Sequence, residues 1–323
     1  MKARGVVFPA ANQVEVWDIE IPEPGPDEVL VRVLYSGISI GTEGWILKNE
    51  YKGVTYPLVT GYQYGGVIES LGSAVSGLAK GDLVFGRHTK LLGDITPMSA
   101  GHVSRAVTPA KDLVKVPKGV GADEASLGVM PGVPWRGIQE TGINEGDLVV
   151  VIGLGLVGQF ACQLLRIKGA RVIAVEPLPL RRELARRFGT EVVLDPAVDD
   201  IEARIRAEKP EGADVITDTS ANAKAVNASF EWIRPRGRYC FQGYYAGLTC
   251  LDLYTPHVKQ LRFFNPTNYE APELMFKYAT EGRLNIKGLI THRFSAEDAP
   301  KAYKLMIESP SEALGIVLDW TKS

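Results

Sequence analysis

The sequence predicts an α/β protein of 323 residues, with a β-rich first part followed by a doubly wound, mostly parallel sheet. Three observations lead to this fold class. Short runs of alternating hydrophobicity fill the first 130 residues, strand and helix patterns alternate from residue 131 onward, and a glycine motif joins a strand to a helix. We expect domains at residues 1–130 and 131–268, with a C-terminal segment, 269–323, that returns to the first domain.

The first part is expected to consist of short strands. Hydrophobic and polar residues alternate in the runs VEVWDIEIP, EVLVRVLY, GGVIES, LVFG, HVSRAV and LVKVP, and proline or glycine separates most of them. This period of two is typical of strands that bury one face. The sequence therefore favours a β-sheet domain here rather than a helical one.

The second part alternates between the two kinds of element. Strands are expected at Leu148–Ile152, Arg171–Val175, Glu191–Leu194, Asp214–Thr217, Arg238–Phe241 and Leu261–Phe264. Helices are expected between them at Gly158–Lys168, Leu180–Phe188, Asp199–Glu208 and Asn222–Trp232. Such alternation predicts right-handed crossovers and a mostly parallel sheet. The remainder, after about Pro272, is expected to hold two helices and a last strand, GIVLDW.

Composition argues against several classes of function. The chain has 36 Lys and Arg against 38 Asp and Glu, a net charge of -2, so no basic excess indicates binding to nucleic acid or an anionic membrane. The three cysteines form no CxxC pair, which fits a reducing, cytoplasmic compartment. The N-terminus does not resemble a signal peptide. The apolar stretch 148–165 contains three glycines and two glutamines, so it favours a buried strand and helix over a membrane span.

The glycine motif predicts a dinucleotide site. A buried strand is followed by Gly153, Gly155 and Gly158 in the pattern GxGxxG, and Leu156 and Val157 lie where the next helix begins. The first glycine permits a tight turn, the second lets a pyrophosphate approach the backbone, and the third lets the helix pack on the strand. The N–H groups of the helix start would then bind the phosphates. The alternative is a glycine-rich turn without a ligand.

The end of the second parallel strand bears on the choice between NAD and NADP. Glu176 follows this strand, where a carboxylate can accept hydrogen bonds from the adenosine ribose and repel a 2′-phosphate. Arg181 and Arg182 follow five and six residues later, and either one could instead bind a 2′-phosphate or be a solvated helix charge. The sequence favours NAD and leaves NADP open.

Four further segments resemble the medium-chain dehydrogenase/reductase superfamily. They are the opening that ends in IPEPGPDEVLVRV, the segment SGIS at 36–39, the segment GYQYGG at 61–66 where the family commonly has Gly-His-Glu, and the ending LITHRFSAEDAPKAYKLM followed by GIVLDW. The resemblance spans essentially the whole chain. It implies a GroES-like β-barrel catalytic domain, a Rossmann domain, and an active site in the cleft between them. It also implies a homodimer.

The departures from the family pattern concern zinc. Zinc-using members bind the catalytic ion through a Cys, a His and a later Cys or acid, and the corresponding positions here hold Ser39, Tyr62 and, less surely aligned, Met130. A hydroxyl, a phenol and a thioether are an unlikely set of zinc ligands. The cysteines of the family's structural zinc lobe are also missing between residues 86 and 106. We therefore expect no zinc. The wording SGISIGTE is similar to dehydrogenases that oxidise a hydroxyethyl group on bacteriochlorophyllide.

Without a Lewis acid, hydrogen-bond donors must stabilise charge on the substrate oxygen. The resemblance places Ser39, Thr42, Glu43 and Tyr62 on catalytic segments. Tyr62 could donate to a carbonyl, Ser39 and Thr42 could relay a proton, and Glu43 could be a base or could orient its neighbours. Each has a structural alternative: Tyr62 as filler of the vacated zinc space, the two hydroxyls as turn residues, and Glu43 as a hydrogen-bond acceptor.

The resemblance also assigns residues to the cofactor and the substrate. It places Gln242, Gly243 and Asn265 near the nicotinamide and Ser220 on the adenosine side. Aromatic side chains are candidates for the wall of a substrate pocket, with core packing as the alternative, and these are Trp45, Tyr51, Tyr64 and Tyr244.

These features together predict a zinc-independent NAD(P)-dependent oxidoreductase. It would transfer hydride between nicotinamide and a secondary alcohol or ketone on a sizeable small-molecule substrate. One alternative is a quinone or enoyl reductase that delivers hydride to an activated C=C bond. Another, from a different class, is a nucleotide-binding protein without catalytic activity.

Overall fold

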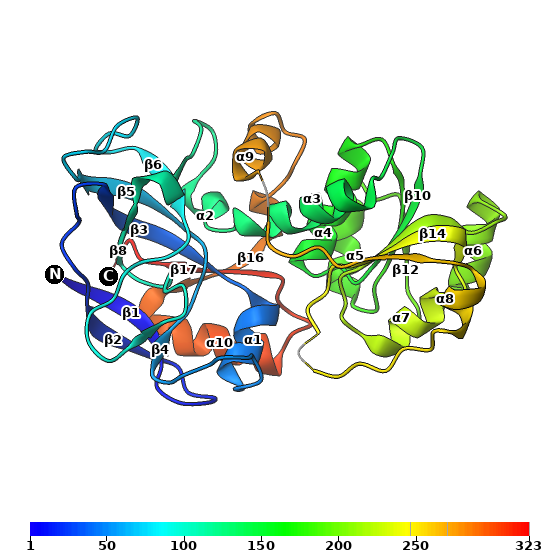
Figure 1. Ribbon diagram of the computed structural model, residues 1–323, viewed down its shortest axis with the longest axis horizontal. Helices are drawn as coiled ribbons and strands as arrows, with labels where there is room; N and C mark the ends of the chain where they lie inside the picture. The colour runs from blue at the N-terminus through cyan, green and yellow to red at the C-terminus, as the bar shows by residue number, and fades with distance from the viewer. Residues whose placement is uncertain (246, 270, 323) are drawn as a thin grey trace. The chain divides into compact units, whose positions relative to one another are not determined.

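The computed structural model describes residues 1–245, 247–269 and 271–322 (Figure 1). The chain divides into two compact units. Unit 1 comprises Met1–Val129, Pro272–Gly282 and Ile286–Ser323, and unit 2 comprises Met130–Ala271 and Arg283–Asn285. The domain boundaries expected after residues 130 and 268 remain a prediction. In the described residues, no helix combines the length and the hydrophobicity that crossing a bilayer requires.

Unit 1 is built on two sheets. The larger has the order β16-β17-β3-β5-β6-β9, with β8 also paired to β3, and the smaller has the order β2-β1-β4-β7. The strands of the larger sheet are β3 (Glu28–Ile38), β5 (Tyr64–Leu71), β6 (Leu83–Gly86), β8 (Arg105–Pro109), β9 (Val114–Lys115), β16 (Ile290–Ser295) and β17 (Gly315–Asp319). Those of the smaller are β1 (Lys2–Phe8), β2 (Glu15–Glu20), β4 (Leu58–Val59) and β7 (Thr96–Pro97).

The C-terminal segment completes the larger sheet of unit 1. Strand β17 pairs antiparallel with β3, with Ile316 opposite Ile38 and Leu318 opposite Ser36. Strand β16 was not expected from the sequence, because its residues alternate only weakly between buried and exposed. Its pairing with β17 places it at the edge of the sheet. The last residues of the chain therefore lie beside the segment that carries Ser39.

Short helices accompany the sheets of unit 1. They are α1 (Ile40–Leu47), α2 (Ala122–Ala125), α9 (Pro272–Thr280) and α10 (Ala299–Glu308), with 3-10 turns at Ala110–Asp112, Lys287–Leu289 and Ala296–Asp298. Helices α1 and α10 contribute Ile46, Leu47, Tyr303 and Met306 to the same hydrophobic core as the strands. Burial of these side chains stabilises both helices, which are too short to be stable alone.

Unit 2 is a parallel sheet of order β12-β11-β10-β13-β14-β15, which confirms the predicted α/β class. Its strands are β10 (Leu148–Ile152), β11 (Arg171–Val175), β12 (Val192–Leu194), β13 (Ala213–Asp218), β14 (Ile233–Phe241) and β15 (Arg262–Phe264). Its helices are α3 (Val129–Thr141, which begins at the last residue of unit 1), α4 (Leu156–Ile167), α5 (Pro179–Arg187), α6 (Ile201–Glu208), α7 (Ala223–Ser229) and α8 (Tyr254–Val258).

Several predicted boundaries in unit 2 differ from the structure by one or two residues, and the two largest errors are next to each other in the chain. Helix α7 ends at Ser229 rather than Trp232, and β14 begins at Ile233 rather than Arg238. The pairing of β14 with β13 shifts register near its start, and Arg236 has a positive φ of 58°. The resulting irregularity interrupts the alternation that sequence patterns detect.

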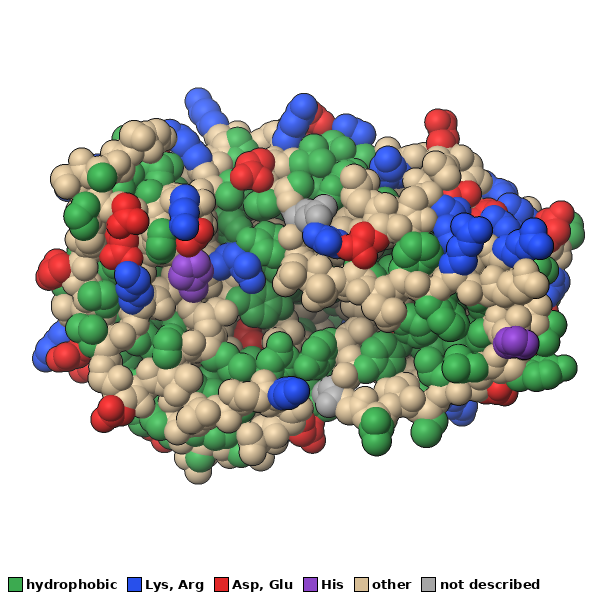
Figure 2. Space-filling model, viewed as in Figure 1, with side chains coloured by type: hydrophobic (Ala, Val, Ile, Leu, Met, Phe, Trp, Pro, Cys, Tyr) green, Lys and Arg blue, Asp and Glu red, His purple; other side chains and the backbone are tan. Residues whose placement is uncertain are grey.

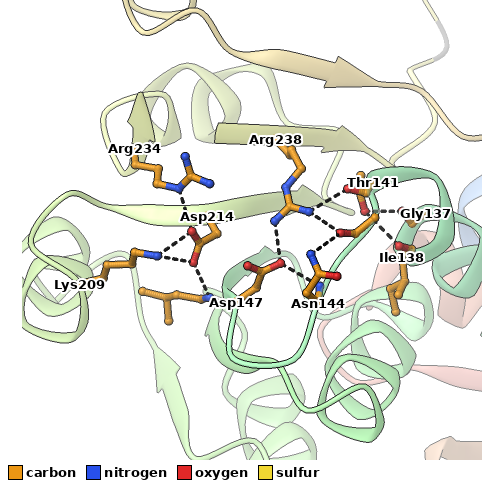
Figure 3. Close-up of polar contacts among 11 residues, drawn as sticks. Gly137, Ile138, Thr141, Asn144, Asp147, Lys209, Asp214, Arg234 and Arg238 are labelled. Atoms are coloured by element: carbon orange, nitrogen blue, oxygen red, sulfur yellow. Dashed lines mark hydrogen bonds and ion pairs between the residues drawn. The ribbon is translucent and has the colours of Figure 1, made fainter. Parts of the chain in front are cut away.

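The amino-terminal edge of the unit 2 sheet is closed by charged side chains (Figure 3). Asp214, near the start of β13, pairs with Lys209 at 2.6 Å and Arg234 at 2.7 Å, and it accepts a hydrogen bond from the Leu148 N–H. Arg238 pairs with Asp147 at 2.6 Å. These contacts join the loops at this edge, so we assign this end of the sheet a structural role and not a ligand-binding one. We call Asp214, Lys209 and Arg234 the Asp214 cluster.

Candidate active site

The carboxyl ends of three neighbouring strands of unit 2 meet at a cavity of about 890 Å³. Ile152, the last residue of β10, lies between Val175 of β11 and Asp218 of β13 in the pairing register. The cavity is lined by residues that directly follow these strand ends, among them Gly153, Glu176, Thr219 and Ser220. In open parallel sheets this edge is where ligands bind.

The three glycines of the motif have different physical roles. Gly153 has a φ of +85°, and a Cβ there would lie 3.0 Å from Ser220. A Cβ on Gly158 would lie 2.0 Å from the Gly153 carbonyl oxygen, so this glycine permits the helix to pack on the turn. A Cβ on Gly155 would meet no atom within 4 Å, and Gly155 lines the cavity.

A pyrophosphate fits this arrangement. Helix α4 begins at Leu156 and continues through Val157 and Gly158, and no side chain caps its first turn at Gly155. Its first N–H groups are therefore available to an anion, and the missing side chain of Gly155 leaves room for one. The residues present thus fit an NAD(P) cofactor on the expected glycine motif.

Glu176 and Arg181 both line the cavity, and Arg182 does not. Glu176 is only 2% exposed, and its carboxylate accepts hydrogen bonds from the N–H groups of Leu154 at 2.6 Å and Leu178 at 3.0 Å. A guanidinium nitrogen of Arg181 lies 4.0 Å from this carboxylate. Arg182 instead binds the carbonyl of Glu176 and the carboxylate of Asp195.

The other predicted cofactor residues are only partly gathered at the cavity. Ser220 lines it and donates a hydrogen bond to Asp218 at 2.6 Å. Gln242 and Gly243 follow β14 and donate their N–H groups to the Asp218 carbonyl. Asn265 is exposed after β15. Among the described residues, the cavity lining does not include Gln242, Gly243 or Asn265, so their placement near nicotinamide stays a prediction.

In unit 1, three of the predicted catalytic hydroxyls lie together. Ser39 precedes helix α1, Thr42 lies in its first turn, and Tyr62 precedes β5. The Tyr62 phenol donates a hydrogen bond to Ser39 Oγ at 2.5 Å. The pKa of Tyr62 is raised to about 12, mainly by burial and also by the Glu43 charge. Hydrogen bonds with Ser39 and Thr42 act in the opposite direction. The phenol is thus protonated at neutral pH and can act as a donor. We call Ser39, Thr42 and Tyr62 the hydroxyl cluster.

Glu43 lies beside this cluster but has no exposed surface. Its carboxylate accepts hydrogen bonds from the Ser39 N–H at 2.8 Å, from the His102 ring at 2.9 Å and from the Tyr303 phenol. All three partners are internal. Of the two functional roles expected for Glu43, this position favours orienting its neighbours over acting as a base on a substrate.

Sequence reasoning missed the partners of Glu43. His102 Nδ1 lies 2.7 Å from Ser36 Oγ, which also accepts a hydrogen bond from Trp320 at 2.9 Å. A Cβ on Gly61 would lie 2.6 Å from the His102 ring, so Gly61 makes room for the imidazole. His102 is one of 4 histidines in the chain, and nothing in the sequence around it distinguishes it from the others. No local pattern points to Tyr303.

The four predicted pocket aromatics have different surroundings within their own units. Tyr64 is completely buried in the core of unit 1, where its phenol donates to the His88 carbonyl at 3.3 Å, so its position favours the alternative of core packing. Trp45 and Tyr51 are partly buried in unit 1. Tyr244 belongs to unit 2 and is 46% exposed.

Comparisons with known proteins agree with both units. Residues 25–118 match the alcohol dehydrogenase GroES-like domain, and residues 157–281 match the zinc-binding dehydrogenase domain. The chain is 29% identical to "Probable D-xylulose reductase A" of Neosartorya fischeri, over 92% of each chain. It is 27% identical to L-threonine 3-dehydrogenase of Pyrococcus horikoshii, over 90% of this chain and 91% of that one.

A solved structure shows the same fold. A short chain alcohol dehydrogenase of Escherichia coli CFT073, complexed with NADH, superposes with a TM-score of 0.86 at 21% identity, over 98% of this chain and 99% of that one. The predicted combination of a GroES-like domain and a Rossmann-type parallel sheet is confirmed.

The name of the second matched domain implies zinc, and the donors present do not fit that ion. Ser39 Oγ and the Tyr62 phenol are bonded to one another, and neutral hydroxyls are poor zinc ligands. Met130 is buried and offers only a thioether. The His102 ring has a partner at each of its nitrogens. Within the described ranges, no group of three or more His, Cys, Asp and Glu is arranged to hold a metal.

Proposed function

We propose, from the premise that the chain belongs to the medium-chain dehydrogenase/reductase superfamily of NAD(P)-dependent oxidoreductases, that it is an alcohol dehydrogenase that works without zinc. The single observation that carries this proposal is the hydroxyl cluster. A phenol and two aliphatic hydroxyls occupy the segments where zinc-using members of the family hold their metal. The substrate would be a ketone or secondary alcohol on a sizeable molecule.

The hydroxyl cluster suits the proton chemistry of such a reaction. When bound, the nicotinamide cofactor supplies or accepts the hydride. As the carbonyl carbon gains hydride, its oxygen gains negative charge and then a proton. Tyr62 is protonated and partly exposed, and its single proton bonds to Ser39 Oγ. If the phenol turns that proton from Ser39 to the substrate oxygen, it can donate it and then take a proton from the Ser39 or Thr42 hydroxyl, which solvent restores. In the oxidation direction the same hydroxyls relay the alcohol proton to solvent, each passing on one proton for the one it takes up.

The charge around the cavity of unit 2 favours NAD over NADP. Glu176, Asp199, Asp200 and Glu202 line the cavity against Arg181 and Lys224. A 2′-phosphate would meet this acidic surplus, whereas ribose hydroxyls can donate to a carboxylate. We expect a lower dissociation constant for NADH than for NADPH, measured by fluorescence titration. Tighter NADPH binding would contradict the preference.

Two glycine variants test whether this cavity holds the cofactor. Gly155→Val places its side chain in open space, so the free energy of unfolding should change little while NADH affinity falls at least about 10-fold. Gly158→Ala places its Cβ against the Gly153 carbonyl, so it should destabilise the fold as well. Unchanged NADH binding by the Gly155 variant would contradict the assignment.

Hydride delivery to an activated C=C bond is the second candidate, because the lack of suitable zinc donors favours it too. The two activities are separated by supplying NADH with aryl ketones or with enones of similar size, and NAD with secondary alcohols. Ketone and alcohol turnover supports the proposed dehydrogenase. Turnover of the enones alone would replace it with a reductase, and cofactor binding without any turnover would favour a non-catalytic protein.

We further propose a homodimer in a reducing, cytoplasmic compartment, where the three free cysteines would persist. Hydrophobic side chains gather on the face of unit 2 around α8 (Figure 2), and the exposed ones include Leu248, Leu253, Tyr254, Val258 and Phe263. Phe263 lies on β15, the edge strand of the sheet, where a second copy can pair. Light scattering should give a mass of two chains, and Phe263→Asp should reduce it to one.

A further inference from the structure

A buried carboxylate lies directly behind the hydroxyl cluster. One oxygen of Glu43 accepts the Ser39 N–H, and the other accepts hydrogen bonds from His102 Nε2 and the Tyr303 phenol. The side chains of Glu43 and His102 are completely buried. Three segments far apart in the sequence therefore meet at one carboxylate.

One placement of protons satisfies all the hydrogen bonds of this group. Trp320 Nε1 can only donate, so Ser36 Oγ accepts from it at 2.9 Å. The Ser36 hydroxyl then has one proton to give, and His102 Nδ1 lies 2.7 Å away. With Nδ1 as acceptor, His102 carries its proton on Nε2 and donates it to Glu43. A neutral imidazole and an ionised carboxylate thus satisfy every group in the chain of bonds.

Packing alone does not explain a carboxylate at this place. An apolar side chain of similar volume would fill such a position without the desolvation that a buried charge incurs. The donors that offset this desolvation come from the residue before α1, from the segment after Gly101 and from α10. What the carboxylate holds in return is the backbone of Ser39, whose hydroxyl accepts the Tyr62 phenol.

We infer that Glu43, His102 and Tyr303 form a positioning group that fixes the backbone of Ser39, and so the donor geometry of the hydroxyl cluster. The C-terminal segment contributes to the site through Tyr303 and, by way of Ser36, through Trp320. This inference rests on the proposed function of that cluster. All three residues are buried, with at most 1% of their surface exposed, so each would act through Ser39 and not by touching the substrate.

The test compares two buried tyrosines, one in each unit, that have the same kinds of neighbour. Tyr303 is 1% exposed, packs edge-on against Phe8 at 5.1 Å and donates to Glu43. Tyr239 of unit 2 is completely buried, packs edge-on against Phe230 at 5.2 Å and shares a hydrogen bond with Ser229. Tyr303→Phe and Tyr239→Phe thus each remove one buried hydroxyl and leave the ring in place.

Hydrogen exchange measures the positioning without requiring turnover. In Tyr303→Phe we expect faster deuterium uptake in peptides that cover residues 36–47, because the Ser39 N–H loses a firmly held acceptor. In Tyr239→Phe we expect uptake there to match the parent chain. Equal uptake at 36–47 in the two variants would overturn the inference.

Kinetics then separates this inference from the proposed function. In Tyr303→Phe, kcat for ketone reduction should fall about 10- to 100-fold while the NADH dissociation constant is unchanged, and Tyr239→Phe should keep the parent kcat. An active parent whose kcat survives Tyr303→Phe would overturn the catalytic role of the group. A parent without turnover would refute the proposed function, and the exchange experiment would still decide the positioning.

Discussion

Glu43 and Asp214 each accept several hydrogen bonds, but from different kinds of donor. Glu43 in unit 1 has no exposed surface and accepts hydrogen bonds from a backbone N–H, an imidazole and a phenol. Asp214 in unit 2 is paired with Lys209 and Arg234, whose side chains are 29% and 32% exposed (Figure 3). Both carboxylates also accept one backbone N–H.

The difference indicates what each carboxylate is for. The Asp214 carboxylate is also buried, at 4% exposure, but the cations of its cluster reach solvent, which screens each ion pair and limits its contribution to stability. Glu43 keeps a charge away from solvent at a considerable desolvation cost and holds the segment that carries the hydroxyl cluster. We therefore assign the Glu43 arrangement to positioning the hydroxyl cluster, and the Asp214 cluster to holding loops together.

The largest effect is expected at the hydroxyl cluster itself. Tyr62→Phe should lower kcat for ketone reduction by about 100-fold or more, because the phenol is the proposed donor to the substrate oxygen. Tyr56→Phe is the matched control, since its phenol donates only to backbone carbonyls, at 2.7 Å for Ile46. Steady-state kinetics on both variants measures this difference. Equal kcat values for the Tyr62 and Tyr56 variants would contradict the proposed role of Tyr62.

A smaller but still large effect is expected on stability at Glu43. Glu43→Gln removes one acceptor oxygen and turns an amide N–H toward groups that donate, so the free energy of unfolding should fall by about 3 kcal/mol. Urea titration measures this loss. A loss below about 1 kcal/mol would mean that the buried carboxylate is no more critical than a surface charge.

Lys209→Met provides the opposite half of the comparison. Asp214 keeps Arg234 and the Leu148 N–H in this variant, so we expect a loss of about 1 kcal/mol or less in the same titration. Kinetic constants should stay unchanged, because the cluster lies at the amino-terminal edge of the sheet. A loss as large as that of Glu43→Gln would remove the distinction drawn between the two carboxylates.

The smallest effect concerns acid. Burial acts to raise the pKa of Asp214, but hydrogen bonds from Lys209, the Leu148 N–H and Arg234 outweigh it and hold the pKa below its usual value of 3.8. A lowered folded-state pKa stabilises the fold above the unfolded-state pKa, and this contribution disappears as pH falls through the folded-state pKa. Stability below about pH 4 should therefore fall less steeply in Asp214→Asn than in the parent chain. The prediction would be contradicted if the free energy of unfolding fell equally steeply with pH in the two proteins.

Much of unit 2 could be predicted because its signals are local. Strands β10 and β11 were predicted at their observed bounds, since continuous buried runs between glycines have little other interpretation. The roles of Gly153 and Gly158 followed from the motif as well. The irregular start of β14 was missed because a positive φ at Arg236 cannot be recognised from the alternation of hydrophobic and polar residues.

In unit 1, the hydroxyl cluster could be predicted only through the family resemblance. Ser39 and Tyr62 are 23 residues apart, and nothing in their spacing shows that they are hydrogen-bonded. Tyr303 is 260 residues from Glu43, a contact that arises from the return of the C-terminal segment. The burial of Tyr64 shows that an aromatic residue next to a site segment can face the core as readily as a pocket. Long-range pairing therefore limits what the sequence alone can specify.

The central claim, that this family member works without zinc, is tested most directly by measuring metal content and activity on the same sample. Elemental analysis of protein purified with zinc in the medium should find far less than one zinc ion per chain. Ketone reduction by that sample should be unaffected by a strong chelator and should disappear in Tyr62→Phe. One zinc ion per chain, together with activity that a chelator removes and zinc restores, would contradict the account.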